Sequence, residues 1–184
     1  MSKVGQKETR ELALEGSVER WFNYNLDIAS RTIFMGSINS NYGSETGVDN
    51  FMAEYFIKGL HTLENISDEP IIVVMNNPGG IWYHGMAIYD AIICSPCKII
   101  IKVYGHAMSM GSIILQAADY RIMMPNSRMM IHYGFSGFSG ESKTSSRWAN
   151  ENNRVNYEME DIYLEAWLNF EKQYVTEKFN HASR

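Results

Sequence analysis

Along the chain, continuous apolar runs alternate with segments whose apolar residues recur at helical spacing. The runs Pro70 to Met75 and Lys98 to Tyr104 are typical of strands buried on both faces. Segment 48–63 instead places its apolar residues on one face of a helix. The predicted strands span residues 32–38, 70–75, 98–104, 120–124 and 128–133, and the predicted helices span 48–63, 82–94 and 111–118. This alternation indicates an α/β fold with a largely parallel sheet, whose chemistry is expected in loops beyond the strand carboxyl ends.

A longer helical pattern runs from about residue 145 nearly to the C-terminus. Trp148, Tyr163 and Trp167 lie outside its apolar face, which is unusual for a helix that packs only within one domain. Two interpretations fit this composition equally well. The helix packs against another subunit, or it folds back on its own domain.

Length and charge narrow the class of protein. The length of 184 residues suits one domain. The net charge of −5 argues against binding to a nucleic-acid backbone, which needs clustered Lys and Arg. Apolar runs stay well below the roughly 20 residues that span a bilayer. The first twenty residues mix acids and bases without an apolar core, unlike a signal peptide. We therefore expect a cytoplasmic protein that binds neither membranes nor nucleic acids.

Two short motifs resemble functional ones but favour structural interpretations. Cys94 and Cys97 form a CxxC pair at the end of a predicted helix, whereas a redox CxxC opens one, so we interpret it as a helix end and turn. A zinc site would need a second ligand pair, which the sequence lacks. Segment 137–144 is a near match to a phosphate-binding loop, but Ser142 replaces the required glycine. We expect no metal and no cofactor.

Ser109 is the first candidate for chemistry. It lies between a predicted strand and a predicted helix rich in small residues, with Gly105 and Gly111 on either side. A sharp turn there would expose the hydroxyl, and the first amides of the helix would point at an oxyanion. The sequence around Ser109 departs from the G-x-S-x-G motif. The alternative is that Ser109 is only a helix N-cap.

A serine becomes a nucleophile when a base accepts its proton, and His132 is placed to do so. It follows the apolar strand beginning at Arg128 and precedes Gly134. Gly79 and Gly80 end another strand, where the missing side chains would let a backbone amide approach a substrate carbonyl. Taken singly, His132 fits a surface histidine and the glycines fit a tight turn.

Taken together, four ordered motifs resemble the Clp protease proteolytic subunit family. They are Asn77-Pro-Gly-Gly80, Gly85-Met-Ala-Ile-Tyr-Asp90, Gly105-His-Ala-Met-Ser-Met-Gly111 and Pro125-Asn-Ser-Arg-Met-Met-Ile-His132. The resemblance implies a crotonase-like α/β fold of repeated strand-strand-helix units with a long C-terminal handle helix. In one domain, 1–184, segment 1–30 would be the N-terminal gate, 31–144 the core and 145–184 the handle.

The resemblance also implies the site and the partners. Ser109 would be the nucleophile, His132 the base, and the amides of Gly79 and Met110 the oxyanion hole, with substrate bound along Gly80 and Ile81. Heptameric rings would stack in pairs into a tetradecamer, and a separate AAA+ unfoldase would deliver polypeptide substrates. The function implied is an ATP-dependent serine endopeptidase that hydrolyses unfolded proteins in a closed chamber.

One departure from the family concerns the acidic member of the catalytic triad. The family carries it in a short motif after the long helix, at a position near His181, and segment 179–184 contains no acid. Losing this acid costs about 10⁴-fold in turnover in serine proteases. Either the chain is shortened, another residue orients His132, or the protein is a weak or inactive ring subunit. We assign no third triad member.

A further alternative is a crotonase relative that binds acyl-CoA, because that superfamily shares the fold and its glycine-based oxyanion hole. Such sites do not need Ser109 and His132 together, which makes this alternative the weaker one.

Overall fold

The computed structural model describes residues 15–36, 47–134 and 142–182, with side chains described as far as residue 169. It forms two compact units, Met1–Ile131 and His132–Arg184. A single domain over 1–184 stays a prediction.

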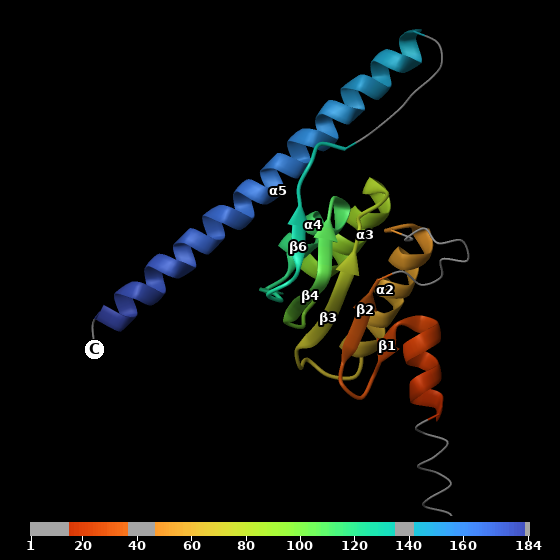
Figure 1. Ribbon diagram of the computed structural model, residues 1–184, viewed down its shortest axis with the longest axis vertical. Helices are drawn as coiled ribbons and strands as arrows, with labels where there is room; N and C mark the ends of the chain where they lie inside the picture. Colours follow the sequence, from red (N-terminus) through yellow and green to blue (C-terminus); the bar gives the residue numbers. More distant parts are fainter. Residues whose placement is uncertain (1–14, 37–46, 135–141, 183–184) are drawn as a thin grey trace, which may run out of the picture. The chain divides into compact units, whose positions relative to one another are not determined.

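The first unit is built on a mostly parallel sheet with the strand order β1-β2-β3-β4-β5, and β6 also pairs with β4 (Figure 1). Pairs β2–β3, β3–β4, β4–β5 and β4–β6 are parallel, and only the short β1 is antiparallel to its neighbour among the described strands. The strands are β1 (Leu26–Asp27), β2 (Thr32–Met35), β3 (Ile71–Asn77), β4 (Ile99–Met108), β5 (Tyr120–Met123) and β6 (Arg128–Met130). The predicted α/β class and the largely parallel sheet are confirmed.

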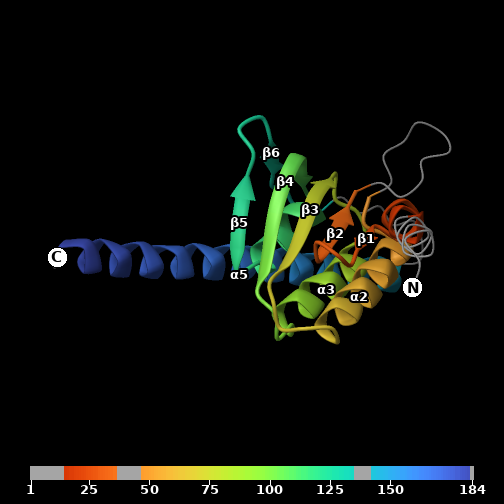
Figure 2. The ribbon, with the colours of Figure 1, turned by 90° about the horizontal axis from the view of Figure 1, so that it is seen from below.

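Helices α2 (Asn50–Glu64) and α3 (Trp82–Ile93) lie side by side against one face of this sheet (Figures 1 and 2). Helix α2 begins where the Asp49 side chain accepts a hydrogen bond of 2.8 Å from the Met52 amide, which satisfies one of the unpaired amides of the first turn. Its buried residues recur every three or four positions: Met52, Ala53, Phe56, Gly59, Leu60 and Leu63. The predicted amphipathic helix is therefore confirmed.

The core lies between the sheet and these helices. Along β3 the side chains alternate, with Ile71, Val73 and Met75 fully buried and Ile72 and Val74 half-buried. In β4 the same alternation buries Ile99, Ile101 and Val103. Removing each such side chain from water stabilises the fold by about 1.5–3 kcal/mol. In β3 and β4, therefore, one set of side chains is fully buried and the other only in part, so the predicted burial of these strands on both faces is wrong for the single chain. The edge strands β5 and β6 are exposed throughout.

Several element boundaries differ from the predictions. Strand β4 continues through Gly105 to Met108, because Gly105 adopts φ +74° where the register with β3 shifts. Strand β6 ends at Met130 and not at residue 133. Residues 15–24 are helical and β1 follows, neither of which was predicted. The ring of Trp21 in that helix lies 6.0 Å from the ring of Phe34 in β2.

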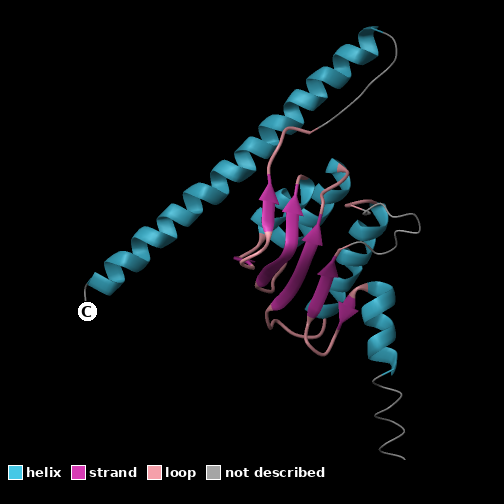
Figure 3. Ribbon diagram, viewed as in Figure 1, coloured by secondary structure: helices cyan, strands magenta, loops and turns pink. Residues whose placement is uncertain are grey.

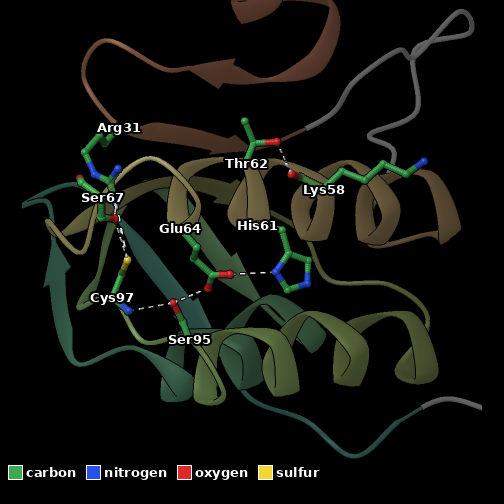
Figure 4. A network of polar contacts seen from close by, with 8 residues as sticks. All are labelled: Arg31, Lys58, His61, Thr62, Glu64, Ser67, Ser95 and Cys97. Atoms are coloured by element: carbon green, nitrogen blue, oxygen red, sulfur yellow. Dashed lines mark hydrogen bonds and ion pairs between the residues drawn. The ribbon is translucent and has the colours of Figure 1, made fainter.

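Arg31 cross-links the loop after α2 to the start of β2 (Figure 4). Its guanidinium donates hydrogen bonds to four backbone carbonyls and lies 3.6 Å from the Cys97 sulfur. The carbonyls belong to Leu63 (2.9 Å), Ser67 (3.0 Å), Glu69 (2.7 Å) and Pro70 (3.3 Å). Cys97 is buried and Cys94 is the C-cap of α3, so the interpretation of CxxC as a helix end and turn is confirmed.

The second unit consists mainly of α5 (Ser142–Ala182), the long helix that the pattern predicted (Figure 3). Tyr133 precedes this helix in the chain, and its hydroxyl donates a 2.6 Å hydrogen bond to Glu160 within α5. Trp148 and Trp167 are about half exposed, at 49% and 59%, and Tyr163 is half-buried. Which surface covers these aromatics stays a prediction. Across the described ranges, no helix is both long and apolar enough to cross a membrane.

Candidate active site

The candidate site lies where two parallel strands of the first unit end together. Asn77, the last residue of β3, is paired with Ala107 near the end of β4. The Pro-Gly-Gly turn after β3 and the serine after β4 therefore leave the sheet at the same edge. Carboxyl ends of parallel strands are where α/β proteins place their ligand-binding loops, as the sequence predicted.

Ser109 occupies a sharp turn between β4 and the short helix α4 (Met110–Ile114). Its backbone has φ +50° and ψ −124°, a region that residues with a side chain rarely adopt. Such a conformation costs on the order of 1–3 kcal/mol and persists only where the surroundings impose it. Ser109 stands at the N-cap position, but its side chain makes no capping hydrogen bond. The helix-cap alternative therefore does not explain why a serine is here.

Backbone hydrogen bonds hold this turn on both sides. The Ser109 amide donates to the carbonyl of Met130 at 2.9 Å, and the Ser109 carbonyl accepts the amides of Ser112 (2.9 Å) and Ile113 (3.4 Å). Because Met130 ends β6, the turn is fixed to the neighbouring strand as well as to its own helix.

Gly79 packs directly against the Ser109 turn. A Cβ atom at Gly79 would lie 2.5 Å from the Ser109 Cβ, 2.7 Å from the Met108 carbonyl oxygen and 2.9 Å from the Met110 nitrogen. No real side chain could occupy that space, and the φ of +100° also favours glycine. The structure thus brings together Gly79, Ser109 and Met110, three of the predicted site residues.

The Gly79 amide has a partner within the protein. It donates a 2.8 Å hydrogen bond to Oδ1 of the buried Asn77. An oxyanion could use this amide only by sharing or replacing that bond. The role of Gly79 as an oxyanion donor therefore stays a prediction, and Asn77 is a site residue that sequence reasoning missed.

Gly80 and Ile81, the predicted substrate-binding residues, are held by Val48. The Val48 amide donates to the Gly79 carbonyl at 2.6 Å, and the Ile81 amide donates to the Val48 carbonyl at 2.8 Å. A Cβ at Gly80 would lie 2.4 Å from backbone atoms of Val48. The backbone here is fixed, while the Ile81 side chain is 53% exposed and open to a ligand.

Met110 anchors the other side of the turn. Its side chain is buried, and a Cβ at Gly85 of α3 would lie 2.1–2.6 Å from its atoms. As the first residue of α4, Met110 carries an amide that has no partner within the helix. An amide in that position is suited to an oxyanion.

His132 is exposed and is the first residue of the second unit. It follows β6, the strand whose final carbonyl accepts the Ser109 amide, by two residues. The pairing of His132 with Ser109 stays a prediction. The position near His181, expected for the family's acid, lies outside the side chains that the structure describes.

The fold and site define an α/β protein with a strained serine at a strand-to-helix turn and a glycine turn packed beside it. Residues 26–176 match the Clp protease family. The chain is similar to the ATP-dependent Clp protease proteolytic subunit 2 of Pseudomonas aeruginosa, with 35% identity over 122 residues that cover 65% of the chain and 61% of the relative. It is also 35% identical to the ATP-dependent Clp protease proteolytic subunit of Deinococcus radiodurans over 152 residues, 80% of the chain and 70% of the relative. The chain belongs to the Clp protease family.

Proposed function

We propose that this protein is a serine endopeptidase subunit of the Clp type that hydrolyses peptide bonds of unfolded proteins. The observation that carries the proposal is the strained Ser109 turn, with the Gly79 backbone packed against it. A backbone cost of this kind is expected at a site where the geometry of one side chain matters for function. Both relatives described above are named as proteolytic subunits, which supports the same activity.

In the proposed reaction, the Ser109 hydroxyl attacks the scissile carbonyl carbon while His132 accepts its proton. The carbonyl oxygen becomes an oxyanion, and the Met110 amide donates a hydrogen bond to it. As the C–N bond breaks, the proton on His132 passes to the leaving amine, leaving an acyl ester on Ser109. A water molecule then gives a proton to His132 as it attacks the ester carbonyl, and His132 passes that proton to the Ser109 oxygen as the ester C–O bond breaks and the second product leaves.

Substrate is proposed to lie along Gly80 and Ile81 as an added strand. Val48 holds this turn through two backbone hydrogen bonds, so the edge offered to the substrate is rigid. A peptide bound in extended form gains affinity from main-chain hydrogen bonds and specificity from alternate side chains. The exposed Ile81 side chain favours an apolar neighbour in the substrate.

We further propose that the subunit assembles into heptameric rings, stacked in pairs, and receives substrate from an AAA+ unfoldase. The names of both relatives include "ATP-dependent", which supports a partner that consumes ATP. The apolar side chains of Tyr120, Ile122 and Met123 in β5 are 41–62% exposed in the single chain, as expected for a surface that another subunit covers.

A second candidate is a catalytically weak or silent ring subunit of the same family. One observation favours it, because the Gly79 amide, the second predicted oxyanion donor, already donates a hydrogen bond to Oδ1 of Asn77. Such a subunit would assemble with an active relative without forming an acyl-enzyme on Ser109.

Labelling with a fluorophosphonate probe, which reacts with activated serines, tests the proposal. We expect the assembled protein to be labelled and to hydrolyse a fluorogenic peptide, and Ser109→Ala and His132→Ala to abolish both signals. Ser127→Ala, in the turn between β5 and β6, where the hydroxyl bonds the Met124 carbonyl, should leave both signals unchanged. Hydrolysis that survives in Ser109→Ala would overturn the proposal. An unlabelled protein that assembles with an active relative would identify the silent subunit.

A further inference from the structure

Ser112, in the third position of α4, is a fully buried polar residue at 0% exposure. The sequence gives it no role, because a serine in a helix rich in small residues is compatible with simple packing. Buried hydroxyl groups are hydrogen-bonded, and the identity of their partners indicates what they hold in place.

The Ser112 hydroxyl has two carbonyl oxygens within reach. Its Oγ lies 2.7 Å from the carbonyl oxygen of Ser109 and 3.0 Å from that of Met130. The single hydroxyl hydrogen donates to one oxygen at a time, and the shorter contact favours the Ser109 carbonyl, while the Met130 carbonyl accepts the Ser109 amide. One hydroxyl therefore contacts both the turn that presents Ser109 and the strand end two residues before His132.

The bond to the Ser109 carbonyl acts on the neighbouring amide. The Ser112 hydroxyl joins the backbone amides of Ser112 and Ile113 as a donor to the Ser109 carbonyl, and it is the shortest of the three contacts. The carbonyl and the Met110 amide belong to one planar peptide unit, so each donor that fixes the C=O helps to fix the direction of the N–H. A donor on the carbonyl oxygen also polarises the peptide and strengthens its N–H as a donor, because hydrogen bonds in a chain reinforce one another. The Met110 amide is the proposed oxyanion donor.

We propose that Ser112 is a positioning residue that orients the Met110 amide toward the oxyanion by holding the Ser109 carbonyl. This inference rests on the proposed peptidase function. Its contribution appears mainly in the transition state, where negative charge develops on the substrate oxygen, and little in substrate binding. Loss of a whole oxyanion donor lowers kcat by about 10²–10³-fold. Removing the Ser112 hydroxyl leaves the Met110 amide in place but misdirected, so we expect kcat to fall by about ten-fold.

The test compares kcat and KM of the full-length assembled protein with those of Ser112→Ala, Ser112→Thr and Ser127→Ala, using one fluorogenic peptide. Ser127 is the matched control, because its hydroxyl also lies 2.7 Å from the carbonyl three residues earlier, that of Met124, and it lies outside the site. Threonine keeps the hydroxyl, and threonine in helices commonly bonds the carbonyl at i−3. Sedimentation velocity and thermal unfolding accompany each assay.

We expect Ser112→Ala to assemble normally and to lose about ten-fold in kcat with an unchanged KM, as a misdirected oxyanion donor would. Ser112→Thr should recover most of the loss, and Ser127→Ala should match the unmodified protein. A kcat for Ser112→Ala within two-fold of the unmodified protein would overturn the inference, as would an equal loss in Ser127→Ala. A rise in KM with an unchanged kcat would also overturn it. If Ser112→Ala fails to assemble, Ser112→Cys, which fills the site with a weaker donor, is judged by the same criteria.

The failure of this inference is distinguishable from failure of the proposed function. If the unmodified protein hydrolyses peptide and Ser109→Ala does not, the function stands whatever Ser112→Ala does. If the unmodified protein neither hydrolyses peptide nor reacts with the probe, the function itself fails.

Discussion

The side chain of Asn77 accepts a 2.8 Å hydrogen bond from the amide of Gly79, so the last residue of β3 shapes the turn that follows it. Asn77 is fully buried, and its Nδ2 lies 3.2 Å from the sulfur of Met52 in α2. The glycine turn beside Ser109 is thus fixed to strand β3 and to helix α2. Glycine permits the positive φ angle of Gly79, and the hydrogen bond to the Asn77 side chain stabilises it.

Asn77→Ala should destabilise the protein and impair the site. The substitution leaves the buried Gly79 amide without its acceptor, which costs about 1–3 kcal/mol in free energy of unfolding. Urea unfolding measures this loss, and Asn126→Ala, at an exposed turn, serves as the control. Equal stability of the two variants would show that the Gly79 amide finds another acceptor.

Gly79→Ala should abolish peptide hydrolysis. The added methyl group would lie 2.5 Å from the Ser109 Cβ and 2.7 Å from the Met108 carbonyl, so the turn must move. A displacement of about 1 Å at a reacting group can cost about 100-fold in rate. Gly16→Ala is the matched control, because its Cβ would meet only the end of the Arg20 side chain at 3.4 Å. Activity of Gly79→Ala above a tenth of that of the control would contradict the close packing seen here.

Much of this fold is predictable from sequence because buried parallel strands and amphipathic helices leave strong patterns. β3, β4, α2 and α3 were expected near their observed bounds. The end of β4 was placed at Gly105, since glycine commonly ends a strand, but here a register shift absorbs its positive φ. The helix at 15–24 was missed because its few apolar residues lie among acids and bases.

The candidate site was predictable in its parts and not in its connections. Ser109 and Gly79 stand out because strand-to-turn boundaries and glycine pairs are visible in sequence. The bond that Asn77 accepts and the bond that Ser112 donates depend on which backbone atoms lie within 3 Å after folding, and asparagine and serine are common in turns for many reasons. Sequence alone therefore identifies the candidate reacting groups more readily than the residues that hold them.

Arg31→Ala should lower the free energy of unfolding by about 2 kcal/mol, because hydrogen bonds from a charged donor are worth more than neutral ones. One carbonyl in the last turn of α2 and three in the loop after it lose their shared donor in this variant. Arg31→Lys keeps the charge but lacks the planar fork, so we expect it to recover only part of the loss. Lys58→Ala breaks an exposed pair with Glu54 and should change stability by less than about 1 kcal/mol. Arg31→Ala as stable as Lys58→Ala would show that the cross-link contributes little.

Asp119 should make stability depend on acidity. Burial alone would raise the pKa of its carboxyl, but hydrogen bonds from the Lys98 ammonium and the Ile99 amide, at 2.7 and 2.8 Å, outweigh burial and lower the pKa below its ordinary value of 3.8. The unfolded chain then binds the proton more readily than the folded one. The stabilisation is fully present above the unfolded pKa and is lost as the pH falls through the folded pKa.

Asp119→Asn removes this titration while keeping an oxygen that can accept the Ile99 amide. We expect urea unfolding to show that the unmodified protein loses stability between pH 5 and pH 3 more steeply than Asp119→Asn, so that the two curves converge toward acid. At neutral pH the unmodified protein should be the more stable. Parallel curves over the same interval would mean that Asp119 titrates alike in the folded and unfolded states, and that its bonds to Lys98 and Ile99 do not favour the charged form.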